Sequence, residues 1–423
     1  MKNKIWLDKK LFESLFSLGL AQAFNYLSPI ISFPLILKEF GVEKYGIISI
    51  AFTLALFFCS LSDFGFNISG IKFIAQSPKT QNKTFSSIFI SKLIFSTLIL
   101  IAFYLLIGFN DSYREYKSVF IFSSGMIIAR VFNSDWFFQG KEKMRFIAIT
   151  NFIANVIYIV GLIVIIKNNL DFTYVALLKS LGLIFSGLIS FICAIYFFKI
   201  KLILKTVNII YYIKRGSPVF ISTIVSNIFQ NTPALLIKAL FSYEIVGIYS
   251  SIEKIVSFGK QMVMIINQIF HPRLAIYYSE NIHNFIRLWK KSSLVSLIAT
   301  ICIYIGLIVA KPSIFNFFLE LKSYEFTSIL YLIMIILIIT YSIINSLGLN
   351  GLLVINKTKE LALSQLYPLG VYVIFSIVYL SLKIDNIFFI VFLLLLSDLM
   401  IILIRIFMFK SYIKQLTRSH IRN

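Results

Sequence analysis

The sequence predicts an all-α membrane protein with about twelve transmembrane helices. We expect them in two six-helix bundles, related by pseudo-two-fold symmetry around a central cationic cavity. Of the 423 residues, 59% are hydrophobic and only 14% are charged, about half the charged share of a typical globular protein. The mean hydropathy is +0.88, and long apolar runs alternate with short clusters of Gly, Pro, Lys and Arg. A soluble fold of this length could not bury so much apolar surface.

Each apolar run is long enough to cross a bilayer, which takes about 20 apolar residues. The first run follows Lys9 and Lys10, is too long for a cleaved signal peptide and lacks a small-residue cleavage site, so we expect it to be retained as a span. The expected spans are 12–37, 44–62, 84–109, 117–139, 145–167, 171–198, 216–240, 244–270, 287–310, 325–348, 360–383 and 386–410.

The most basic gap lies at the centre of the chain and divides it into two expected domains. Residues 1–200 form the N-terminal six-helix bundle, 201–215 a basic cytoplasmic linker, and 216–423 the C-terminal bundle with a short basic tail. A weak repeat supports two halves, because the segments beginning at Pro34 and Pro233 share a Leu-Ile-Lys pattern and then a Gly-Ile pair. Parallel repeats of this kind build transporters that alternate access to a central cavity.

The formal charge of +22 does not indicate a nucleic-acid-binding protein. The basic residues stand in short clusters between apolar runs, as the positive-inside rule requires of cytoplasmic loops. Counted over the expected loops, most Lys and Arg fall on the side of the N-terminus. Both termini are therefore expected in the cytoplasm, with Trp6, Trp136 and Trp289 in an aromatic belt at the inner interface.

No pattern in the sequence indicates an enzyme, a metal site or a cofactor. Cys59, Cys193 and Cys302 lie in apolar runs without metal-ligand spacing. There is no Walker A loop and no dinucleotide-binding glycine fingerprint. A membrane polysaccharide polymerase or ligase remains an alternative, but the expected outer loops are short for a catalytic site.

Ionisable residues within the expected spans are candidates for a lumenal site, because charge in a bilayer is costly and usually faces the bundle interior. Basic residues outnumber acidic ones, and since buried charges are normally paired, an anionic ligand could supply the missing partner. For Lys92, Lys260 and Arg405 an equally good alternative is a side chain that extends (snorkels) to the membrane interface instead of facing the lumen. The candidates are Lys92, Arg130, Lys179, Lys254, Lys260 and Arg405, with Glu253 and Asp398 as the acids.

Polar uncharged residues form a stripe on one helix of each half. Gln22 and Asn25 share a face in the first expected span, and Asn227, Gln230 and Asn231 share one in the seventh. Such residues either hydrogen-bond between helices or contact the hydroxyl groups of a sugar.

Two turns carry a resemblance to a known family. Asp63 and Gly65 follow the second expected span, where Asp63 could also cap the next helix. The fourth span ends in Trp136, Gln139, Gly140, Glu142 and Met144. Gly140 is expected in a conformation that a β-carbon disfavours. Together these turns resemble the bacterial polysaccharide-repeat-unit flippases (Wzx-type) of the multidrug/oligosaccharidyl-lipid/polysaccharide exporter superfamily.

The resemblance implies a flippase of the bacterial cytoplasmic membrane that carries an undecaprenyl-pyrophosphate-linked oligosaccharide, an O-antigen or capsule repeat unit. Its partners would be that substrate, membrane lipids and other polysaccharide assembly proteins, with no nucleic acid. Pyrophosphate would bind lumenal cations, Arg130 and Lys254 first. A multidrug antiporter of the same superfamily is a further alternative, although it would favour an acidic lumen. If transport is ion-coupled, Glu253 and Asp398 are the candidate acids.

Overall fold

The computed structural model describes residues 9–76, 80–203, 208–316 and 325–422, and all of their side chains except those of 9–27, 272, 325 and 416–422. The regular structure in these ranges is helical throughout. Nine helices among them are long and apolar enough to cross a membrane. The protein is therefore a multi-pass, all-α membrane protein.

The chain divides into two compact units, Met1–Asn231 and Thr232–Asn423. The boundary falls within α10 (Ile209–Leu240), so one continuous helix contributes to both units. Part of the expected linker binds to the first unit, because the backbone N–H groups of Ile203 and Asn208 donate to Ser86 and Ser87 of α3 (Gln81–Phe109). The division into two six-helix bundles stays a prediction.

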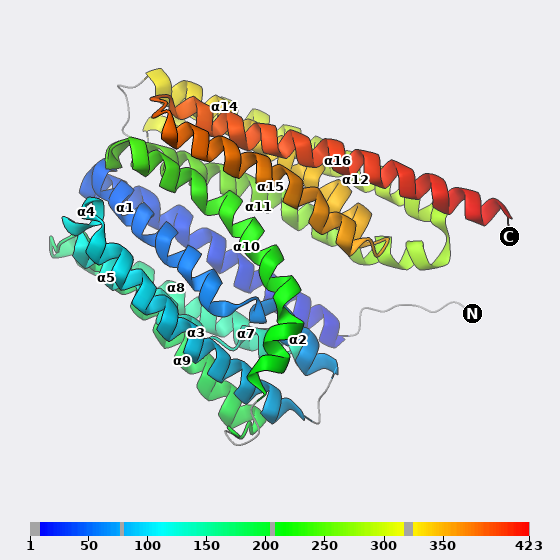
Figure 1. Cartoon of the computed structure of the whole chain (residues 1–423), viewed down its shortest axis with the longest axis horizontal. Coiled ribbons are helices and arrows are strands. Elements are labelled where there is room, and N and C mark those ends of the chain that lie inside the picture. The colour runs from blue at the N-terminus through cyan, green and yellow to red at the C-terminus, as the bar shows by residue number, and fades with distance from the viewer. Residues whose placement is uncertain (1–8, 77–79, 204–207, 317–324, 423) are drawn as a thin grey trace. The chain divides into compact units, whose positions relative to one another are not determined.

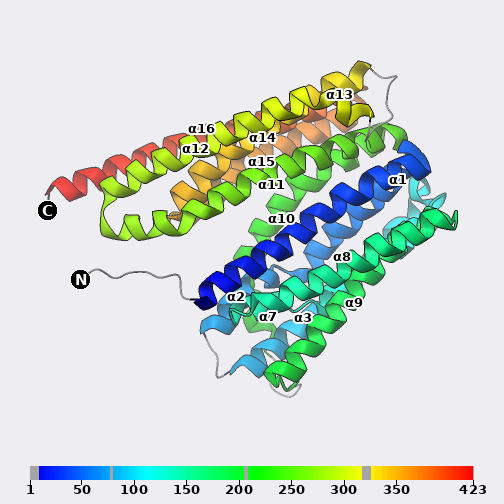
Figure 2. The same ribbon diagram turned by 180° about the vertical axis from the view of Figure 1, so that it is seen from behind.

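The first unit is built around four long helices. These helices, α1 (Lys9–Asp63), α3, α8 (Met144–Lys167) and α9 (Thr173–Phe198), run side by side in Figures 1 and 2. The first two expected spans are joined in α1, where non-helical backbone occurs at Gly41. The shorter helices are α2 (Phe66–Gln76), α4 (Asp111–Arg114), α5 (Lys117–Ser123), α6 (Gly125–Phe132) and α7 (Asp135–Gly140).

The expected span 117–139 is divided into α5, α6 and α7, and side chains of α9 hydrogen-bond to the backbone at the two interruptions. Asn133 adopts an extended conformation between α6 and α7. The N–H of Ser134 donates to Ser190 Oγ over 2.9 Å, and Ser180 Oγ donates to the carbonyl of Phe122 over 2.6 Å. Broken helices are tolerated at membrane depth only where protein groups satisfy the freed backbone, and here serines of α9 do so.

The second unit packs its long helices against one another in a separate bundle (Figure 1). The π-helix η3 (Gly348–Leu353) continues directly from α14 (Glu325–Leu347), and single-turn π segments of this kind often mark functional sites. The other helices of this unit are α11 (Tyr243–Glu280), α12 (Ile282–Val309), α13 (Lys311–Ile314), α15 (Thr358–Ser381) and α16 (Ile387–Arg422).

Each of the twelve expected spans falls on one or more of these helices, but the number of crossings stays a prediction. The first two share α1, and the pieces of the fourth are short. Helix α11 is not among the nine apolar candidates, and it carries Glu253, Lys254 and Lys260 within the expected span.

Candidate functional site

A cavity of about 260 Å³ lies within the first unit, where the end of α1 and the start of α2 approach α6 and the middle of α10. Its polar wall combines side chains of three chemical kinds. Pockets for drug-sized ligands usually measure about 300–1,000 Å³, so this cavity holds one small group and not a whole oligosaccharide. Asp63 and Arg130 supply charge, Asn67, Asn227, Gln230 and Asn231 supply amides, and Ser60 and Thr223 supply hydroxyls.

One wall is the elbow between α1 and α2. Gly65 has φ +69, and a β-carbon on it would lie 2.9 Å from the backbone nitrogen of Phe220 in α10. The ring of Phe64 stacks on that of Phe220 with 4.1 Å between centroids. The elbow therefore needs glycine both for its conformation and for its contact with α10.

Asp63 caps the next helix, as the sequence suggests, and it is also paired with a lysine. Its Oδ2 accepts the backbone N–H of Asn67 over 3.0 Å. Its Oδ1 lies 2.7 Å from Lys92 Nζ, and Lys92 is only 1% exposed. Lys92 Nζ also donates to Asn67 Oδ1 over 3.1 Å. Snorkelling is therefore wrong for Lys92, whose buried charge is matched by a carboxylate.

Arg130 reaches the cavity from α6. It lines the cavity together with Cys59, and its charge acts on Cys59, Asp63 and Asp135. Within the described part of the chain no carboxylate lies within 4.0 Å of its guanidinium as a salt bridge. Arg130 is thus the cation that this cavity can offer to an anion.

The polar stripe of α10 forms another part of the wall. Asn227, Gln230 and Asn231 all line the cavity, together with Thr223. The amide nitrogens of Asn227 and Asn231 donate to the carbonyls of Thr223 and Asn227 on their own helix. The structure thus brings Arg130 and the second predicted stripe together. The side chains of Gln22 and Asn25 lie outside the described residues.

The other predicted lumenal residues lie elsewhere. Lys179 Nζ lies over the ring of Tyr158, 4.5 Å from its centroid, away from this cavity. In the second unit Lys254 lies 3.2 Å from Glu253, which also accepts Ser257 Oγ over 2.5 Å. Lys254 is therefore not an unpaired cation.

Farther along the second unit, three charged side chains are tied to neighbouring helices. Lys260 Nζ lies 5.8 Å from the ring centroid of Tyr341. Asp398 accepts Thr340 Oγ1 over 2.5 Å. Arg405 is 2% exposed and donates to Ser364 Oγ and to the carbonyl of Ile344. Snorkelling is wrong for Arg405 as well, since its guanidinium is bound inside the bundle.

The predicted signature turn packs against α2 and lines no part of the cavity. Trp136 is 2% exposed and stacks on Phe85 with 5.5 Å between ring centroids, so its ring packs inside the protein, and its depth at the inner interface stays a prediction. Gly140 has no positive φ, and its β-carbon would instead meet Ile74 Cβ at 2.9 Å. The left-handed residue of the turn is Glu142, with φ 56, while Gln139 is half-buried.

The surplus of buried positive charge is smaller than the sequence suggests. The sequence count placed Asp63 in a turn and left out Asp135, yet both act on the charges of Lys92 and Arg130. Asp135 is held by Asn133, whose Nδ2 donates to its Oδ2 over 3.0 Å. The signal that could have located them is their position, because Asp135 lies within the expected span 117–139 and Asp63 directly follows the expected span 44–62.

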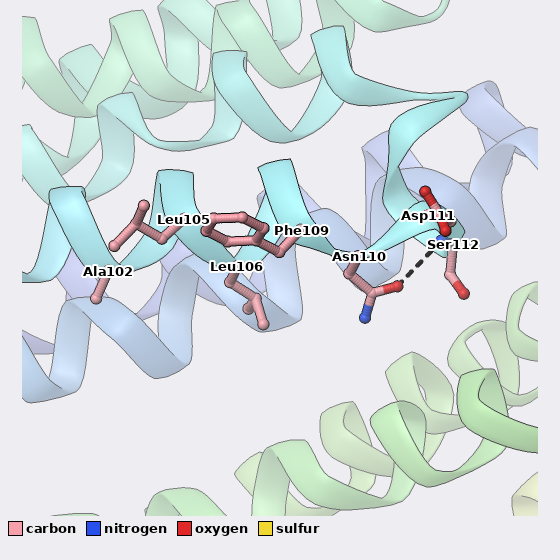
Figure 3. A pocket seen from close by; sticks show the side chains of 7 residues that line it. All are labelled: Ala102, Leu105, Leu106, Phe109, Asn110, Asp111 and Ser112. Carbon is pink, nitrogen blue, oxygen red and sulfur yellow. Dashed lines mark hydrogen bonds between the residues drawn. The ribbon is translucent and has the colours of Figure 1, made fainter.

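A second hollow, at the end of α3, offers little chemistry (Figure 3). It is lined by Leu105, Phe109 and neighbouring residues, and Phe109 is 85% exposed. Its polar contact is the N–H of Ser112 donating to Asn110 Oδ1 over 3.0 Å. An open, apolar surface of this kind is ordinary on a helix that faces lipid.

Proteins of similar sequence are named as transporters. A proposed O-antigen transporter of Shigella dysenteriae is 24% identical over 364 residues, covering 84% of this chain and 88% of that protein. A proposed O-antigen transporter of Escherichia coli (strain K12) is 22% identical over 262 residues, covering 61% of this chain and 63% of that protein.

Solved structures of similar fold include a lipid flippase and a multidrug transporter. The lipid II flippase MurJ, in an inward closed conformation, matches with a TM-score of 0.72 and 16% identity over 93% of this chain and 87% of its own. An inward-facing multidrug resistance MATE family transporter of the MOP superfamily matches with a TM-score of 0.64 and 12% identity over 95% of each chain. These likenesses show the fold.

The family model described as polysaccharide biosynthesis protein matches residues 11–277, which is more than half of the chain. The matched range includes both signature turns and every residue that lines the cavity. The chain therefore belongs to the polysaccharide biosynthesis protein family, which confirms the resemblance that the two turns indicate.

Proposed function

We propose that this protein is a flippase that moves a lipid-linked oligosaccharide across the bacterial cytoplasmic membrane by alternating access. The substrate is an undecaprenyl-pyrophosphate-linked repeat unit of O-antigen or capsule. The observation that carries the proposal is the cavity of the first unit, where Arg130 faces the amides of Asn227, Gln230 and Asn231. The relatives named as O-antigen transporters support the same class of substrate.

The chemistry of the wall suits this substrate. A guanidinium binds phosphate oxygens through paired hydrogen bonds. Side-chain amides both donate and accept, as sugar hydroxyls do. Because the cavity measures about 260 Å³, it holds the pyrophosphate and the adjoining sugar ring at most, and the remaining sugars lie outside it. A cationic drug, the substrate class of a multidrug antiporter, would be repelled by Arg130.

Both termini lie in the cytoplasm in this proposal, which the excess of Lys and Arg on that side supports. Transport draws on an ion gradient or on consumption of the substrate outside the membrane, and Glu253 and Asp398 are the candidate coupling acids. Reporter fusions at each terminus test the orientation. A reporter that is active only outside the cytoplasm would overturn it.

The test of function is deletion of the gene, with analysis of the lipid-linked repeat units. The proposal predicts that complete units accumulate on the inner leaflet and that surface polysaccharide is lost. Unpolymerised units on the outer leaflet would instead indicate a polymerase, and an absence of assembled units would indicate an earlier biosynthetic step. Complementation with the Arg130→Gln variant, expressed at parental level, should fail.

A further inference from the structure

The inference concerns Lys92, a buried charge that does not itself line the cavity. We propose that Lys92 is a positioning residue: it neutralises Asp63 from α3 and so leaves the Arg130 guanidinium available to the anionic group of the substrate. The proposal rests on the proposed function, because it assumes an anion at Arg130.

Asp63 and Arg130 are opposite charges on the wall of one small cavity. Cys59 lies four residues before Asp63 and so on the same face of α1, about one turn or 6 Å along the helix. Arg130 lines the cavity together with Cys59, and its charge already acts on Asp63. A modest movement of the long arginine side chain would therefore bring the two into contact.

The two groups are kept apart because Asp63 is satisfied by other partners. Lys92 Nζ lies 2.7 Å from Oδ1, and the N–H of Asn67 donates to Oδ2 over 3.0 Å. Lys92 Nζ also donates to Asn67 Oδ1, which closes a ring of contacts among three residues from α1, α2 and α3. The carboxylate is thereby matched by a cation that is only 1% exposed.

Without Lys92, the cation that shares the cavity wall with Asp63 is Arg130. A buried carboxylate that loses its partner is strongly destabilised, so it would be drawn to the guanidinium. An arginine–carboxylate pair uses the same forked hydrogen bonds as an arginine–phosphate pair. Asp63 would then compete with the substrate anion for the Arg130 guanidinium. Because Asp63 belongs to the same chain, its effective concentration at Arg130 would be high.

Asp135 is the other acid that faces this cluster. Its charge acts on both Lys92 and Arg130, its Oδ2 is bound by Asn133, and it does not line the cavity. It is present in every variant compared below, so its contribution is common to all of them. The alternative role of Lys92 is purely structural, a tie between helices.

Variants that neutralise Asp63 as well as Lys92 distinguish the positioning role of Lys92 from a purely structural one. The full-length protein is purified in lipid nanodiscs, and the affinity for inorganic pyrophosphate is measured for the parent and four variants. The variants are Lys92→Met, Asp63→Asn, the double variant Lys92→Met/Asp63→Asn, and Arg130→Gln. Lys357→Met is the matched control, because Lys357 belongs to an ion pair with Glu360 (3.8 Å) outside this site.

The proposal predicts that Lys92→Met weakens binding roughly tenfold, in the usual range of coupling between sites, while the double variant recovers parental affinity. Asp63→Asn alone should bind more tightly than the parent, because it removes a negative charge from the cavity wall beside Arg130, and this variant still decides the matter if Lys92→Met does not fold. A double variant as weak as Lys92→Met, an unaffected Lys92→Met, or an Asp63→Asn that binds no more tightly than the parent would each overturn the proposal.

The same measurements distinguish failure of this inference from failure of the proposed function. If the parent shows no binding that Arg130→Gln abolishes, the anion site itself is wrong, and the role of Lys92 falls with it. If that binding is present but the double variant does not recover, only the role of Lys92 is wrong. The thermal unfolding midpoint of each variant, measured in parallel, shows whether affinity merely follows stability.

Discussion

Arg130 is the residue on which the proposed chemistry depends. It is one of two charged side chains on the cavity wall, and the other, Asp63, is already paired with Lys92. The sequence identified Arg130 and the stripe of α10, because charged and polar residues stand out in apolar runs. It could not identify the pairing of Lys92, because that contact joins separate helices and leaves no periodic signal.

The Arg130→Ala variant should abolish surface polysaccharide while protein levels stay normal. Hydrogen bonds to charged groups are worth about 1.5–3 kcal/mol each, so loss of the guanidinium should weaken pyrophosphate binding at least tenfold. Arg130→Lys keeps the charge but not the forked geometry, and it should fall between parent and alanine. Surface polysaccharide and binding are measured in the three proteins, and full function in Arg130→Ala would refute the site.

The Lys254→Ala variant tests the second predicted pyrophosphate contact. Lys254 is paired with Glu253 at 3.2 Å and is 41% exposed, so its loss also leaves a carboxylate without this partner. We expect surface polysaccharide to be lost while the protein still accumulates. Normal surface polysaccharide in this variant would show that Lys254, which does not line the cavity, is no contact of the substrate, and it would leave the case for Arg130 unchanged.

At the scale of elements, apolar runs predicted where helices lie but not where they break. The elbow at Phe64 and Gly65 and the interruption at Asn133 arise from close contacts with α10 and α9, which come from separate parts of the sequence. The predicted importance of the turn after the fourth span remains, but its physical reason changes. Gly140 is required for close packing on α2, not for a left-handed backbone.

The structure of the elbow predicts that replacing Gly65 destabilises the protein more than replacing another glycine of the first unit. In Gly65→Ala the left-handed backbone alone should lower the free energy of unfolding by about 1–2 kcal/mol. The clash of the β-carbon, which would lie 2.9 Å from Phe220 N, should add to this loss. Gly108→Ala is the matched control, since a β-carbon there meets nothing within 4 Å. Thermal unfolding of both variants is the measurement, and equal midpoints would contradict the elbow's role.

The turn that contains Gly140 should affect activity without affecting selectivity. A valine at Gly140 would press on Ile74 Cβ at 2.9 Å and on the carbonyl of Ile71 at 3.0 Å, and so force α7 from α2. We expect Gly140→Val to lose export of every oligosaccharide tested, because the turn supports the fold and lines no part of the cavity. A changed choice of oligosaccharide would instead assign the turn to the binding site.

For the whole molecule, the proposed transport needs a source of energy. The sequence contains no nucleotide-binding pattern, so directional flipping would draw on an ion gradient or on removal of the product. A coupling acid has to change its protonation state as substrate binds. Glu253 suits this role better than Asp398, because its direct partners are a lysine at 3.2 Å and a serine, whereas the Asp398 carboxylate accepts a hydrogen bond from the uncharged Thr340.

The coupling hypothesis predicts how Glu253→Gln responds to a proton gradient. An anion that binds Lys254 would take the lysine from Glu253, and a carboxylate without its cation binds a proton more readily. Transport in vesicles should therefore rise with an imposed pH gradient in the parent and respond little to it in Glu253→Gln. Asp398→Asn, changed in the same conservative way, should keep the response. If the parent ignores the gradient, or Glu253→Gln follows it fully, Glu253 is not the coupling residue, and a response lost only in Asp398→Asn would transfer the role to that acid.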